Sequence, residues 1–103
     1  MSTKPVTLMG IGDEAGPEID HQLAAIRELA WTCLEARTIE VPGFPKSNIH
    51  DLEDAAFDLA RRKLEAAGVR VYCFGSTIMN WAKTPASPFS ETLAEVKRAI
   101  PRM

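Results

Sequence analysis

The chain has 103 residues, of which 46% are hydrophobic and 25% charged, a balance typical of one small folded domain rather than of a disordered or fibrous protein. Twelve basic residues stand against fourteen acidic ones, so the formal charge is -2 and no basic stripe predicts binding to a nucleic acid. The apolar runs are far shorter than the roughly 20 residues that cross a bilayer, and residues 1–8 lack the apolar core of a secretory signal. We therefore expect a cytoplasmic protein with no membrane or nucleic-acid partner.

The first half of the chain predicts two strands and one helix. Residues 6–11 are a short apolar run that predicts a buried strand, and the helical spacing of apolar residues over 17–31 predicts an amphipathic helix. Residues 33–39 alternate between apolar and polar side chains, which is typical of a second strand. Two prolines and a glycine within residues 42–48 then predict a loop.

The second half continues this alternation. Asp51 is the expected cap of a helix that ends at Gly68, and residues 69–74 predict a third strand with Val69, Val71 and Cys73 on one face. A long connection over residues 75–88 leads to a last helix. We expect Ser90 to cap that helix and Phe89 to pack on Ala94, and the side chains expected to face the core are Leu93, Val96 and Ile100.

Strands that alternate with full-length helices favour right-handed parallel crossovers and disfavour antiparallel hairpins. The strand starts near residues 6, 33 and 69 are separated by about 27 and 36 residues, and eight units of this size make a barrel of about 250 residues. The sequence thus predicts an α/β domain over residues 1–103, with three parallel β-α units that form an incomplete (β/α)8 TIM barrel.

Ligands of parallel α/β proteins gather at the carboxyl ends of the strands, so the polar side chains there are the candidate site residues. They are Asp13, Glu14, Glu35, Arg37, Asn80 and Trp81.

Each candidate has a functional and a structural interpretation. Glu35 and Arg37 lie two residues apart on one strand, so both project to the same face. Glu35 suits proton transfer and Arg37 suits binding of a hydroxyl, carboxylate or phosphate, although a structural ion pair fits equally well. Asp13 and Glu14 can accept hydrogen bonds from sugar hydroxyls or simply cover a polar loop. Asn80 and Trp81 likewise suit a sugar, while a loop tryptophan also packs over a core rim.

The remaining chemistry-bearing residues predict no metal or redox site. Cys33 and Cys73 are 40 positions apart beside apolar residues, which is typical of buried thiols. His21 is expected on the polar side of the first helix. His50, in a loop, is expected to be solvated rather than to act as a metal ligand or base.

Several stretches resemble one family. Leu34-Glu35-Ala36-Arg37-Thr38 is similar to the second-strand "VELR" stretch of the xylose isomerase-like TIM barrels, in particular the sugar phosphate isomerase/epimerase group. Residues 64–71 resemble the family's segment that leads from a helix into its third strand. Residues 73–78 followed by Trp81 resemble the end of that strand.

The resemblance implies that the chain is the N-terminal part of a protein that isomerises or epimerises a sugar or sugar phosphate. The implied reaction is proton transfer assisted by a divalent metal, which is Mn, Mg, Co or Zn in such enzymes. The family's metal ligands come from later strands, so the resemblance assigns no metal ligand to this chain and implies little activity for it alone.

Two alternatives remain open. Gly10-Ile11-Gly12 followed by Gly16 has the pattern of an NAD(P)-binding Rossmann turn, with Glu35 placed for the ribose. Against it, Asp13 and Glu14 would repel a pyrophosphate, at a cost of about 4 kcal/mol for charges about 4 Å apart. The other alternative is a non-catalytic module that self-associates through open strand edges.

Overall fold

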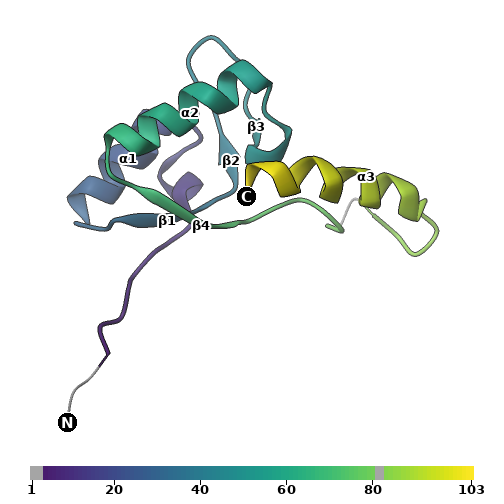
Figure 1. Ribbon diagram of the computed structural model, residues 1–103, viewed down its shortest axis with the longest axis horizontal. Coiled ribbons are helices and arrows are strands. Elements are labelled where there is room, and N and C mark those ends of the chain that lie inside the picture. Colours follow the sequence, from purple (N-terminus) through teal and green to yellow (C-terminus); the bar gives the residue numbers. More distant parts are fainter. Residues whose placement is uncertain (1–3, 81–82) are drawn as a thin grey trace.

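The computed structural model describes residues 4–80 and 83–103, which form a mixed α/β arrangement (Figure 1). Strands β1 (Cys33–Ala36) and β4 (Arg70–Phe74) make a two-stranded parallel sheet. Helices α1 (Ile19–Glu28) and α2 (Asp54–Ala66) lie on one side of this sheet, and α3 (Phe89–Ala99) extends away from it. The α/β class is therefore confirmed, together with parallel pairing between the second and third predicted strands.

A β-bulge interrupts the pairing of β1 with β4. Leu34 pairs with Val71, but the next residue, Glu35, pairs with Cys73, so Tyr72 is left over between them. As a result Val71 packs against the core while the Cys73 thiol faces Glu35. The prediction that Val71 and Cys73 share a face is wrong, because the extra residue resets the alternation.

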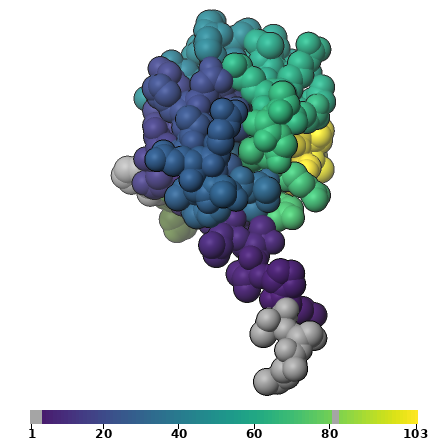
Figure 2. Space-filling view, turned by 90° about the vertical axis from the view of Figure 1, so that its left-hand side faces the viewer, coloured from purple at the N-terminus to yellow at the C-terminus, as the bar shows by residue number. Residues whose placement is uncertain are grey.

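The predicted first strand is reduced to a single bridge. Ile11 makes an isolated parallel bridge with Glu35, and the Glu35 N–H donates to the Gly10 carbonyl at 2.9 Å. Val6 and Leu8 are 82% and 62% exposed. Figure 2 shows the segment before Gly10 projecting from the body of the molecule. This segment therefore follows β1 in direction without completing a third strand.

The predicted second strand divides at Arg37. Beyond it, β2 (Thr38–Ile39) pairs antiparallel with β3 (Ser47–Asn48), which lies in the predicted loop. Gly43 has a positive φ of 89°, a backbone conformation that lets the chain turn back between these strands. The expectation that no antiparallel hairpin forms is therefore wrong.

Two predicted helix caps are also wrong. Asp51 belongs to a short 3-10 helix, η2 (Ile49–Asp51), and α2 begins only after Glu53. Ser90 lies inside α3, which starts after Pro88, and Phe89 is 71% exposed, so it does not pack on Ala94.

The hydrophobic core lies between the sheet and helices α1 and α2. Its buried members are Ile19, Ile26, Leu34, Ala36, Ile39, Val41, Ile49, Leu52, Ala56, Ala60, Leu64 and Val69. Leu93 and Ile100 stay 41% and 62% exposed, so the prediction that they face inward is wrong. No helix in the described part of the chain is both long and apolar enough to span a bilayer.

Candidate functional site

Asp13 and Arg37 form a two-point ion pair at the carboxyl end of β1. Asp13 lies in the 3-10 helix η1 (Gly12–Ala15), and Arg37 follows β1 directly. Arg37 Nη2 donates to Asp13 Oδ1 at 2.6 Å, and Nε donates to Oδ2 at 2.8 Å. The Thr38 N–H also donates to Oδ2, at 3.0 Å. This geometry links η1 firmly to the end of β1.

The charges of this pair hold both groups ionised. Hydrogen bonding to Arg37 keeps the pKa of the Asp13 carboxyl below its usual range, and the Thr38 N–H acts in the same direction against the effect of burial. Asp13 in turn raises the pKa of Arg37. Glu14 Oε1 lies 3.4 Å from Arg37 Nη2, with its side chain 73% exposed, so it is a looser partner on the solvent side.

Glu35 has a different partner from the one expected. The Cys73 thiol donates to Glu35 Oε1 at 2.8 Å, and Arg37 pairs with Asp13 instead of Glu35. The Glu35 carboxylate raises the pKa of Cys73, first through this hydrogen bond and then, with burial, through its charge. Cys73 is half-buried rather than fully buried, whereas Cys33 is buried as expected.

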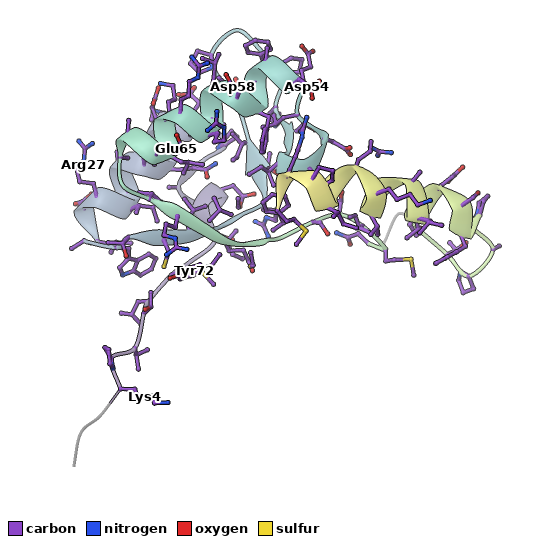
Figure 3. All side chains as sticks on the ribbon, in the orientation of Figure 1. Lys4, Arg27, Asp54, Asp58, Glu65 and Tyr72 are labelled. Atoms are coloured by element: carbon purple, nitrogen blue, oxygen red, sulfur yellow. The ribbon has the colours of Figure 1, made fainter. Side chains whose placement is uncertain are left out.

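Glu35 and Arg37 both lie beside the backbone of Gly75, on one face. A Cβ atom at Gly75 would lie 3.3 Å from Arg37 Cβ and 3.4 Å from Glu35 Oε2, so the backbone of Gly75 packs closely beside both side chains. Tyr72 points away from α2 and is 52% exposed (Figure 3). Leu34 and Ala36 face the helices, so Glu35 projects from the other side of the sheet. We call Asp13, Glu35, Arg37 and Gly75 the rim cluster.

Gln22 of α1 binds the backbone next to the rim cluster, and no motif in the sequence predicts this contact. Its side chain is buried, and Nε2 donates to the carbonyls of Pro17 at 3.0 Å and Thr38 at 2.9 Å. A side chain at Gly12 would clash with Gln22, and one at Gly10 would press on Trp31. Packing alone thus explains these two glycines of the Rossmann-like pattern.

The other predicted site residues lie after β4. The Asn80 N–H donates to the Thr77 carbonyl at 3.0 Å, and the Thr77 N–H donates to Asn48 Oδ1 at 2.8 Å. These bonds tie the start of the long connection to β3. Trp81 lies outside the described residues. The structure therefore brings together Asp13, Glu14, Glu35 and Arg37 and places Asn80 in a neighbouring turn.

The rim cluster does not suit a metal ion. Both carboxylate oxygens of Asp13 already accept hydrogen bonds from Arg37, and Glu35 accepts one from a thiol. Among residues 4–80 and 83–103, the one group of histidine and acidic side chains close enough to share a metal lies elsewhere, at His50, Asp51 and Glu95.

His50 is fully buried, so the prediction that it is solvated is wrong. Its Nε2 lies 3.2 Å from Glu95 Oε2 and 3.3 Å from Asp51 Oδ2. Its Nδ1 is buried without a hydrogen-bond partner in the described part of the chain. Arg98 Nε donates to the other Asp51 oxygen, Oδ1, at 3.0 Å. His21, by contrast, is 65% exposed on α1, as predicted.

Comparisons with known proteins identify no relative of this chain. No protein-family model matches the chain, and no curated protein or solved structure matches it either.

Proposed function

We propose that the chain forms the first β-α units of a xylose isomerase-like barrel and supplies one rim of a site for a sugar or sugar phosphate. The observation that carries this proposal is the convergence of Asp13, Glu35 and Arg37 at the carboxyl ends of parallel chain segments. In parallel α/β proteins this end of the sheet is where ligands bind. The resemblance of residues 34–38 to the family's second strand points to the same place.

The proposed chemistry centres on Glu35. Its carboxylate projects from the side of the sheet opposite the helices, where Oε2 lies beside the backbone of Gly75. A sugar hydroxyl on this side of the sheet can donate to Glu35, which is then placed to take up a proton. Arg37, which is 41% exposed, and the exposed Glu14 offer charged groups of both signs to the hydroxyls or phosphate.

A divalent metal is implied by the resemblance, but the rim cluster does not fit one. Asp13 is fully engaged by Arg37 and Thr38, so it has no oxygen to spare for a cation. We therefore assign sugar binding and proton transfer to Glu35, Arg37 and Glu14, and no step depends on a metal.

Titration with sugars, followed by amide NMR, tests the proposal. Adding aldose and ketose phosphates at millimolar concentration is expected to shift the amide signals of Glu35, Arg37 and Gly75 in a saturable way. Glu35→Gln should weaken this response, and Arg27→Gln, on the exposed side of α1, should not. Saturable shifts that avoid the rim cluster, or no shifts at all, would contradict the proposal. Saturation by NADH instead would favour the Rossmann alternative.

A second candidate function is self-association without catalysis. The outer edge of β4 faces no other strand in the described part of the chain, and α3 leaves Phe89, Leu93 and Ile100 exposed. Unpaired strand edges and clustered apolar side chains are common features of interaction surfaces.

A further inference from the structure

We propose that His50, Asp51 and Glu95 bind a divalent transition-metal ion of the zinc class, which fastens α3 to the rest of the domain. These residues come from two elements, η2 and α3, that are far apart in sequence. One ligand atom from each lies within 4.8 Å of the other two. The His50 side chain is fully buried, and those of Asp51 and Glu95 are 34% and 15% exposed.

The distances from His50 Nε2 to the two carboxylates are close to those between neighbouring ligands of one ion. Zinc binds imidazole nitrogen and carboxylate oxygen at about 2.0–2.2 Å, which sets neighbouring ligands of a tetrahedron about 3.3–3.6 Å apart. The observed separations from His50 Nε2 are 3.2 Å to Glu95 and 3.3 Å to Asp51.

The proton count at His50 also favours a cation. Nε2 carries at most one hydrogen, yet two carboxylates converge on it. That hydrogen can serve only one of the two carboxylates fully, so the other faces the ring without a donor from it. A divalent ion on Nε2 compensates both carboxylates at once.

The surroundings leave the required atoms available. Arg98 bonds to Oδ1 of Asp51, so Oδ2 remains free to face His50 and the ion. A pocket of about 420 Å³, lined in part by His50, Asp51 and Arg98, opens beside the cluster. Three protein ligands leave a fourth position open, and solvent in this pocket can supply it.

Such an ion would join η2, which packs on the core through Ile49, to α3, whose apolar side chains are largely exposed. Binding to the folded state alone raises the stability of that state. We therefore expect Zn²⁺ to raise the thermal unfolding temperature and to slow hydrogen exchange in α3.

Zinc binding by matched variants of α3 tests the inference. Calorimetric titration with Zn²⁺ should show one site, and Glu95→Gln should weaken binding by more than about tenfold and abolish the thermal shift. Glu91→Gln removes the same charge from an exposed position of the same helix, 61% exposed beside Lys83, and should bind like the parent chain.

Spectroscopy on the parent chain provides a second test, which does not depend on whether Glu95→Gln folds. Zn²⁺ should shift the Nε2 resonance of His50 and leave that of His21 unchanged. Co²⁺ should give the visible absorption of a tetrahedral nitrogen and oxygen site. An unshifted His50, equal affinities for the two variants, or a thiolate-to-cobalt band that assigns the ion to Cys73 would overturn the inference.

Discussion

Asp13 is the residue that joins the N-terminal segment to the sheet, because its carboxylate accepts two side-chain donors of Arg37 and one backbone donor. Its side chain is 9% exposed, so water replaces these bonds poorly. We predict that Asp13→Asn lowers the free energy of unfolding by about 2 kcal/mol in urea denaturation. Asp20→Asn removes an exposed partner of Lys63 and should cost less than about 1 kcal/mol. Equal losses in the two variants would refute a special role for Asp13.

The same residue makes stability depend on pH in a defined direction. Arg37 holds the pKa of Asp13 below its ordinary value of 3.8, so the folded state binds this proton less readily than the unfolded state. The contribution of Asp13 is therefore complete above pH 3.8 and is lost as the pH falls through the lower pKa of the folded state. The stability gap between the parent and Asp13→Asn should shrink in that range. A constant gap would contradict the assignment.

Glu35 and Cys73 give a chemical readout of the rim cluster. Because the Glu35 carboxylate raises the pKa of the Cys73 thiol, little of it is thiolate near neutral pH. We predict that Glu35→Gln increases the rate of alkylation of Cys73 by iodoacetamide several-fold at pH 8, measured by peptide mass spectrometry. Glu14→Gln removes an equal charge that contacts Arg37 rather than Cys73, and should leave the rate unchanged. An unchanged rate in Glu35→Gln would show that the two side chains are not in contact.

For individual residues, the sequence predicts which side chains lie close together but not which of them form ion pairs or hydrogen bonds with one another. The i,i+2 spacing correctly places the side chains of Glu35 and Arg37 on one face, because side chains on a strand alternate. The choice of Asp13 over Glu35 as the partner of Arg37 depends on the path of η1, which no local pattern encodes. Burial of Gln22 and His50 is equally hidden, since their hydrogen bonds are made to residues distant in sequence.

Among the elements, α3 departs most from its sequence pattern. Its apolar residues recur at helical spacing, yet the contacts that hold it are largely polar. Amphipathic spacing predicts a buried stripe only where another element covers it. The bulge at Tyr72 and the hairpin after Arg37 depend likewise on partners across the sheet, so the strand ends could not be predicted from the sequence.

Arg102, just beyond α3, makes several of these polar contacts. It donates to the carbonyls of Ile49 and His50 at 3.1 and 3.3 Å and to Asp54 at 2.8 Å. Its guanidinium also lies 4.5 Å from the centroid of the Phe57 ring. The side chain is only 14% exposed, so solvent cannot replace these contacts easily.

We predict that Arg102→Ala frees α3 while leaving the sheet intact. Without added metal, amide hydrogen exchange in α3 should accelerate about tenfold, whereas exchange in β1 and α2 should change little. Lys97→Ala, at an exposed position of the same helix, should preserve the protection of α3. Uniform acceleration throughout the chain in Arg102→Ala would instead indicate loss of global stability.

At the scale of the whole molecule, helices cover one side of the sheet, and no helix of the described residues covers the other. Figure 1 shows α1 and α2 on the same side of β1 and β4, and Tyr72 points to the opposite side in Figure 3. A closed barrel covers this inner side with further strands, which is consistent with the proposed incomplete barrel. A second copy of the chain could cover it as well, by pairing along the edge of β4.

The two arrangements differ in how the chain behaves in dilute solution. If β4 pairs with a second copy, the sedimentation coefficient should rise with protein concentration in the micromolar range. Tyr72→Lys adds a charge to the exposed bulge of β4 and should abolish this rise, because charged side chains on an edge strand oppose pairing. Leu59→Lys makes a similar change on α2, where Leu59 is 39% exposed, and should leave the rise intact. A constant coefficient for the parent chain would exclude pairing through β4 and leave the incomplete barrel as the better account of the open face.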